Sequence, residues 1–299
     1  MMMSSIEHFS IIFKIGIPDN MIAEKRKEIN EMKKLITIFV LATLFLSIAS
    51  IGIAADNNPN NAQAEKLSLP ENAVEVAPGV FYLGKALDKG QVVEGYAFVH
   101  YAKDSDHSKP VWDDTVDIYK FMFGGIKWEN TMQYEVNPAA SGLEDTEVLD
   151  ALGASLETWN DAITETPSSF ELFDTLVSFE EDATPGERDG KNIVVWRDLA
   201  EPRAIAYNVF WFSPAMKVIV DSDVVFNTDY DWSVGDICSG DKMDLQSIAT
   251  HEFGHNGLND LYMSPSVELT MYGYSNYGDI DKRTLGTGDI SGIQALYGI

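Results

Sequence analysis

Cysteine is almost absent from this chain, because Cys238 is the single cysteine among its 299 residues. One thiol cannot form an internal disulfide, so stability must come from a hydrophobic core and from bound ions. Cys238 lies in a glycine-rich acidic loop, and carboxylates nearby raise the pKa of a thiol, which disfavours a cysteine nucleophile. With 45% hydrophobic and 11% aromatic residues, a chain of this length can bury a sizeable core.

Basic residues are also scarce, since 21 lysines and arginines stand against 47 acidic residues, for a net charge of −26. Such a surface repels nucleic acid and anionic membranes, so we exclude nucleic acid as a partner and regard the surface as a poor partner for membranes. The acidic residues are spread along the chain, as expected for solubility in a salty medium. These carboxylates are also candidate ligands for structural Ca²⁺, but no individual calcium site can be assigned.

Long apolar runs are limited to one, the uncharged stretch Leu35–Ala55, which follows two lysines and ends in small residues. This pattern predicts a signal peptide cleaved near Ala54 or Ala55, and hence a secreted protein. The run has 21 residues, which is also enough to span a bilayer, so an uncleaved membrane anchor is the alternative. We therefore assign residues 1–55 to a signal peptide or N-terminal anchor, with a start-site extension before Met32.

Residues 56–123 are predicted to form a linker and a small N-terminal β region. The stretch 56–65 is polar and rich in asparagine, which is typical of flexible linkers. Two alternating apolar segments follow, Val80–Leu83 and Tyr96–Val99, and the turn residues Asp88–Gly90 lie between them. The segments therefore read as strands joined by a turn. No internal repeat is visible in the chain.

A second unit, residues 124–299, is predicted to be an α+β domain. A helix introduced by Ser141 and Gly142 carries an apolar stripe at spacings of three and four, formed by Val148, Leu152, Leu156 and Trp159. Alternating apolar residues predict strands at Met132–Val136, Ser178–Phe179, Asn192–Trp196, Ala204–Phe212 and Lys217–Phe226. Another helix begins near Asp244, and a last one follows Asp289. Strand, helix, strands and helix in this order describe the α+β class.

A metal-binding motif is predicted in the segment His251-Glu252-Phe253-Gly254-His255. Histidines four residues apart project from the same face of a helix, close enough to bind one ion, and Zn²⁺ is the natural ion for this pair. Glu252 lies beside them, where it can take a proton from a zinc-activated water and pass it to a leaving amine. Asp244 is a good N-cap for this helix. We therefore predict His251 and His255 as zinc ligands and Glu252 as the general base.

A catalytic zinc needs three protein ligands and one open position. The remaining histidines precede residue 124, outside the predicted catalytic domain, and the third ligand is therefore expected to be a carboxylate. Asp260 is the nearest one, because Gly257 can end the helix with a positive φ and turn the chain back toward the metal.

Asp289 is an alternative third ligand, because some zinc peptidases take theirs from an Asp well after the histidine pair. It lies in the segment Gly286-Thr-Gly-Asp289. The same Asp also fits the start of the C-terminal helix, where a carboxylate accepts hydrogen bonds from free backbone amides.

Four segments of the chain resemble the matrixin branch of the metzincins, over about residues 124–299. They are Asp244-Leu-Gln-Ser-Ile-Ala-Thr-His-Glu-Phe-Gly-His255, Asn259-Asp-Leu-Tyr262, Thr270-Met-Tyr-Gly-Tyr274 and Gly288-Asp-Ile-Ser-Gly-Ile-Gln-Ala-Leu-Tyr-Gly298. The likeness is to secreted prokaryotic members in which an Asp replaces the third histidine. It implies a metzincin-like catalytic domain with a twisted mixed sheet and an active-site helix, preceded here by the small β region.

The resemblance implies further roles for particular residues. Met271 would be the Met-turn residue beneath the zinc, and Tyr274 would form a wall of the specificity pocket. The strand Ala204–Phe212 would be an edge strand that receives the substrate as an added strand. Two departures are visible: Asp260 comes one residue earlier than the family pattern places the ligand, and no cysteine switch precedes the domain.

The sequence thus predicts a secreted zinc-dependent endopeptidase, a hydrolase that acts on protein or peptide substrates, with His251, His255 and Asp260 on the metal. A membrane is a partner only if the N-terminal segment stays uncleaved, and nothing indicates an oligomeric state. The alternative is a catalytically impaired matrixin-like scaffold that binds peptides or surfaces, because the shortened turn before Asp260 can displace that ligand.

Overall fold

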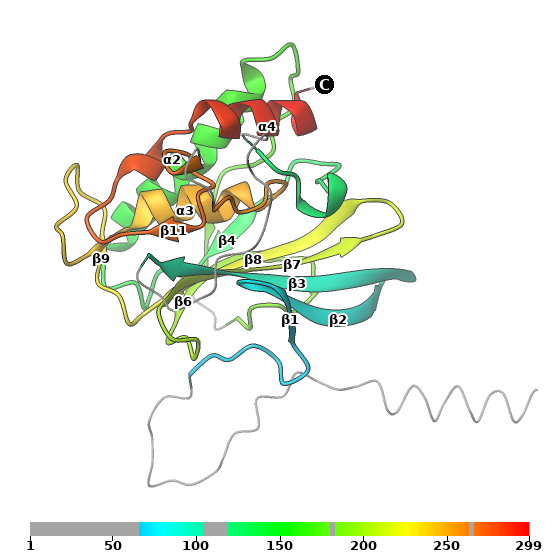
Figure 1. Ribbon diagram of the computed structural model, residues 1–299, viewed down its shortest axis with the longest axis horizontal. Helices are drawn as coiled ribbons and strands as arrows, with labels where there is room; N and C mark the ends of the chain where they lie inside the picture. Colours follow the sequence, from blue (N-terminus) through cyan, green and yellow to red (C-terminus); the bar gives the residue numbers. More distant parts are fainter. Residues whose placement is uncertain (1–65, 104–118, 180–182, 263–265, 299) are drawn as a thin grey trace, which may run out of the picture. The chain divides into compact units, whose positions relative to one another are not determined.

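The computed structural model describes residues 66–103, 119–179, 183–262 and 266–298 (Figure 1). All of them belong to one compact unit, which spans Asn61–Ile299. Among these described residues, no helix is long and apolar enough to cross a bilayer. The predicted signal peptide or anchor, residues 1–55, lies outside the described part and stays a prediction.

A mixed sheet of nine strands forms the centre of the described part. Its strands are β1 Val74–Ala77, β2 Val80–Asp88, β3 Gln91–Ala102, β4 Tyr134–Val136, β5 Val177–Ser178, β6 Asn192–Arg197, β7 Ala204–Ser213, β8 Val218–Asn227 and β11 Tyr274–Ser275. They are ordered β1-β2-β3-β7-β8-β6-β4-β5, and β11 pairs with β3. The two short strands β9 Trp232–Ser233 and β10 Met243–Asp244 pair separately.

Three helices pack against one face of this sheet (Figure 1). They are α2 Asp145–Thr164, α3 Leu245–Gly254 and α4 Thr287–Tyr297, and two short 3₁₀ helices lie at η1 Met122–Gly124 and η3 Asp281–Arg283. The predicted apolar stripe of α2 is buried in the core below the helices, with Leu152 and Trp159 fully inaccessible. The expected α+β fold is therefore confirmed.

The first two long strands form a hairpin because the residues between them allow a tight turn. Lys89 and Gly90 both have positive φ, of 45° and 83°, as a two-residue hairpin turn of type I′ requires. The pairing then runs from Asp88 opposite Gln91 to Val80 opposite Phe98, with one irregularity between Tyr82 and Gly84. The predicted β region before residue 124 thus exists, but its strands are part of the large sheet.

The prediction that Ala204–Phe212 is an edge strand is wrong. Strand β7 pairs with β8 on one side and with β3 on the other, both antiparallel. All ten of its residues are buried. The hairpin of β2 and β3 extends the sheet past β7, and among the described strands β1 is the outermost on that side.

The helix α3 approaches α2 closely because Gly254 has no side chain. A Cβ at this position would overlap the sulfur of Met271 and the indole ring of Trp159. The indole nitrogen of Trp159 also donates a hydrogen bond to the Thr250 carbonyl of α3, at 2.8 Å. This contact fixes the distance between the two helices.

Gly254→Ala is therefore expected to destabilise the protein by about 1–3 kcal/mol, because a well-packed core must shift to accept the methyl group. The control is Gly153→Ala on α2, where a Cβ has no atom within 4 Å. That change should stabilise by roughly 0.5–1 kcal/mol through the lower entropy of the unfolded chain. Urea denaturation midpoints measure both, and equal stability of the two variants would contradict this account.

Candidate metal centre

The helix α3 begins at the predicted N-cap. The carboxylate of Asp244 accepts a hydrogen bond from the backbone N–H of Ser247, at 2.8 Å, and another from the Arg283 side chain, at 2.9 Å. A carboxylate there also suits the positive end of the helix dipole. The helix places the side chains of His251 and Glu252 in the protein interior, where both are inaccessible to solvent.

The end of α3 differs from the prediction. The helix ends at Gly254 with His255 as its C-cap, and Gly257 does not have a positive φ. The turn instead tightens, because the N–H groups of His255 and Asn256 bond to the carbonyls three residues earlier, at 3.1 and 3.2 Å. Gly257 is needed for another reason, since a Cβ there would overlap Leu296 of α4. Close packing, rather than a left-handed backbone, requires this glycine.

The chain after this turn brings Asp260 to the two histidines. Its Oδ1 lies 3.1 Å from Nε2 of His251 and 3.6 Å from Nε2 of His255. All three side chains are buried, and their ligand atoms lie within 4.8 Å of one another. Within the described residues, Nε2 of His251 and Oδ1 of Asp260 have no hydrogen-bond partner. Buried polar atoms without partners are costly, so this point fits a bound cation.

The hydrogen bonds behind the imidazoles support the same conclusion. Nδ1 of His251 lies 2.7 Å from the Thr270 carbonyl, and Nδ1 of His255 lies 3.0 Å from the Leu258 carbonyl. A carbonyl can only accept, so each Nδ1 carries the proton and each Nε2 offers a lone pair to the shared point. This is the arrangement that orients histidine ligands of metals.

Electrostatics give the three residues the ionisation states that a metal requires. Burial, and then the charge of Lys282, lower the pKa of His251 to about 4, and burial also lowers that of His255. For Asp260, burial alone would raise the pKa, but the interactions with His255 and His251 hold it below its usual value. Two neutral imidazoles and one carboxylate form a donor set that suits Zn²⁺.

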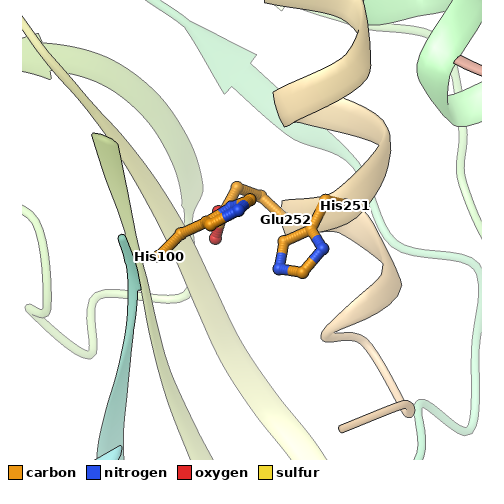
Figure 2. Close-up of side chains that lie close together, drawn as sticks. All are labelled: His100, His251 and Glu252. Carbon is orange, nitrogen blue, oxygen red and sulfur yellow. The ribbon is translucent and has the colours of Figure 1, made fainter. Parts of the chain in front are cut away.

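Glu252 lies next to these ligands, but it is not free. Its Oε1 lies 2.9 Å from Nδ1 of His100, while its Oε2 has no hydrogen-bond partner among the described residues. Figure 2 shows His100 approaching from β3 and His251 and Glu252 from α3. Burial, and then the charge of Asp260, raise the pKa of Glu252 well above its usual value.

The position of His100 differs from the one that we predicted. We placed it outside the catalytic domain, yet its ring centroid lies 3.9 Å from that of His251. Its Nε2 lies 3.1 Å from the Ser275 hydroxyl, and His100, His251 and Glu252 form a second group able to hold a metal. A signal was present, because His100 stands inside an alternating apolar strand, where a histidine is expected to have buried partners. His107 lies outside the described residues.

Lys282 is a second residue that the sequence did not reveal. Its ammonium group donates a hydrogen bond to the Tyr272 carbonyl and lies 3.3 Å from Nδ1 of His251. It is buried, and burial lowers its pKa to about 8. A positive charge here offsets the negative charges of Asp260 and Glu252. No sequence pattern distinguishes Lys282 from a surface lysine.

Met271 lies in the core beneath the α3 helix, in contact with the backbone of Gly254. Its N–H and that of Thr270 both donate to the Asp289 carboxylate, at 3.2 and 2.7 Å, and so does the N–H of Gly286, at 2.9 Å. Asp289 thus holds the Met271 turn and the start of α4. It belongs to neither of the metal-capable groups found among the described residues.

Tyr274 lies on β11, in an aromatic cluster beside the metal centre. Its ring centroid is 5.2 Å from that of Tyr262, whose hydroxyl donates to Oδ2 of Asp260 at 3.0 Å. Tyr262 therefore orients the third predicted ligand. In the register of the sheet, Tyr274 is paired with Tyr101 of β3, and its side chain is buried.

Two neutral imidazoles, a carboxylate and a neighbouring glutamate define a buried centre that can bind one metal ion. The family model described as matrixin matches residues 127–298, and the chain belongs to the matrixin family. The predicted resemblance is confirmed. The family consists of metalloendopeptidases that typically use zinc. Among the described residues no metal-capable group is made of carboxylates alone, so calcium stays a prediction.

A curated relative is the interstitial collagenase of Equus caballus, which is 27% identical over 194 residues. The match covers 61% of this chain and 35% of the collagenase, so the chain spans about a third of that relative's length. Among solved structures, the metalloproteinase-II from Bacteroides fragilis matches with 10% identity and a TM-score of 0.30, over 74% of this chain and 77% of that one. This second likeness is too low to support any conclusion.

Proposed function

We propose that this protein is a secreted zinc-dependent endopeptidase with His251, His255 and Asp260 as ligands and Glu252 as general base. The observation that carries the proposal is the convergence of two Nε2 lone pairs and one carboxylate oxygen on a single buried point. Membership of the matrixin family supports it.

Bound zinc would polarise the scissile carbonyl and activate a water molecule for attack. Glu252 Oε2 would accept a proton from that water and then pass it to the leaving amine. A carboxylate whose pKa burial has raised suits both steps, because it can hold the proton between them. Tyr262 keeps Asp260 oriented throughout, and Asp289 holds the turn that carries Met271.

The division of the chain is also part of the proposal. Residues 1–55 would act as a signal peptide, or as an anchor if uncleaved, and 124–299 would form the peptidase domain. Met271 would support the metal centre from below, and Tyr274 would contribute to the pocket for a substrate side chain. The substrates would be extracellular proteins or peptides.

The test is zinc stoichiometry together with casein hydrolysis on purified protein that starts at Asp56. We expect one zinc per chain, and prolonged incubation should give hydrolysis that a chelator abolishes and added zinc restores. Folded protein that binds no zinc would refute the enzyme and favour the peptide-binding scaffold.

A further inference from the structure

The strand β3 fills the place where a substrate peptide would bind. Peptidases commonly bind an extended substrate by adding it as a strand to a free sheet edge. Here β3 pairs with β7 antiparallel, from Glu94 opposite Phe212 to Tyr101 opposite Ala204. On its other side, the end of β3 pairs in parallel with β11, where Tyr101 lies opposite Tyr274. Both strands that flank the metal centre therefore already have a partner from the same chain.

The side chains of β3 also cover the predicted catalytic residues. Alternate residues of the strand face α3: the Phe98 ring lies 4.5 Å from the His255 ring, and the His100 ring 3.9 Å from the His251 ring. Nδ1 of His100 is 2.9 Å from Oε1 of Glu252. Phe98 and His100 are each 2% exposed. A substrate carbonyl would need the space that these two rings occupy.

The hairpin that carries β3 is built to stay in place. Along its outer side β3 pairs with β2, and the Val99 N–H donates to the Gly79 carbonyl at 2.8 Å. On the face away from the helices, Ala97, Val99 and Tyr101 pack into a separate cluster of buried apolar residues, together with residues of β6 and β7. The strand is thus held by backbone bonds on both edges and by side chains on both faces.

We propose that residues 74–102 act as an intramolecular inhibitor, in which β3 occupies the peptide cleft as a substrate-like strand and His100 blocks Glu252. This inference rests on the proposed endopeptidase function. Hydrolysis of a substrate then requires β3 to leave β7, after displacement or cleavage of the hairpin. The bound strand β3 would also keep the peptidase latent in a chain that has no cysteine before the predicted catalytic domain.

Gly95 offers a way to release the strand without touching the metal centre. A Cβ at Gly95 would lie 2.6–2.7 Å from three ring atoms of Trp211 on β7. That indole cannot move easily, because its nitrogen donates to the Gly186 carbonyl at 3.1 Å and Arg188 lies 4.8 Å from the ring. Gly95 is five residues from His100, about 17 Å along the strand. Gly95→Val should therefore weaken the pairing of β3 with β7.

The experiment compares the native chain with Gly95→Val and His100→Ala, each loaded with zinc, and uses Gly153→Ala as the control. We expect both test variants to hydrolyse a fluorogenic peptide at least 10-fold faster than the native chain, and the control to match it. Gly95→Val should also speed amide hydrogen exchange in 94–102. A synthetic peptide of residues 91–102 should bind the Gly95→Val variant in calorimetry and inhibit its hydrolysis of the fluorogenic peptide. The same synthetic peptide with His100→Ala should bind more weakly.

Two outcomes would overturn a proposal. Zinc-dependent hydrolysis that is equally fast in the native chain and both variants, with no binding of the synthetic peptide, would overturn the inhibitor and leave the endopeptidase intact. Absence of zinc from all the variants would overturn the endopeptidase itself. If Gly95→Val fails to fold, His100→Ala decides alone, because it removes the contacts of β3 with Glu252 and His251 and so makes release of the strand easier without a clash at Trp211. A rate equal to that of the native chain would then overturn the inhibitor.

Discussion

Replacing Glu252 by Gln is expected to lower kcat for peptide hydrolysis by roughly 100- to 10,000-fold, the range for loss of a positioned general base. The amide has nearly the shape of the carboxylate but cannot accept the proton of the attacking water. The variant should still bind zinc, because Glu252 is not among the three predicted ligands. The measurement is steady-state hydrolysis of a fluorogenic peptide in the Gly95→Val background, with zinc content determined alongside.

Glu157→Gln is the matched control for this substitution. Glu157 is exposed on α2, far along the chain from the histidine pair, and its replacement should leave kcat and zinc content unchanged. If Glu252→Gln retained native activity, Glu252 would not be the base. If it instead lost zinc, the metal would lie in the group formed by His100, His251 and Glu252.

Replacing Asp260 by Asn should weaken zinc binding by more than the roughly 100-fold that loss of an outer hydrogen-bond partner can cause. The change removes the one negative charge of the predicted donor set, beside two neutral imidazoles. Competition with a chelator of known zinc affinity measures the effect. Urea denaturation of the metal-free protein shows whether the variant is folded.

Asp289→Asn is the companion variant, and it separates the two candidate third ligands. The Asp289 carboxylate accepts three backbone N–H groups, so its loss should destabilise the fold by about 1–3 kcal/mol. Zinc affinity should stay within a few-fold of the native value. The reverse result, with zinc lost from Asp289→Asn and retained by Asp260→Asn, would make Asp289 the ligand.

Much of the helix α3 could be predicted from the sequence because its determinants are local. The N-cap Asp244 and the spacing of His251 and His255 lie within one short stretch of chain, where helix geometry alone fixes which side chains share a face. The same holds for the stripe of α2 and for the hairpin turn at Lys89 and Gly90. Each depends on periodicity or on backbone conformation over a few residues.

The end of α3 shows where local reasoning stops. Gly257 was assigned a left-handed conformation because glycine commonly ends helices in this way. In the structure its small size matters instead, because Leu296 of α4 packs against it. A residue some forty positions later thus determines why glycine stands there, and no local pattern contains that information.

The sequence by itself determined the family, the α+β class and the helix that carries His251, Glu252 and His255. Only the tertiary structure decided that β3 lies between β7 and β11 and that His100 reaches Glu252. The physical reason is that alternation specifies which face of a strand is buried, while the choice of neighbouring strand depends on pairing between segments more than a hundred residues apart in the chain.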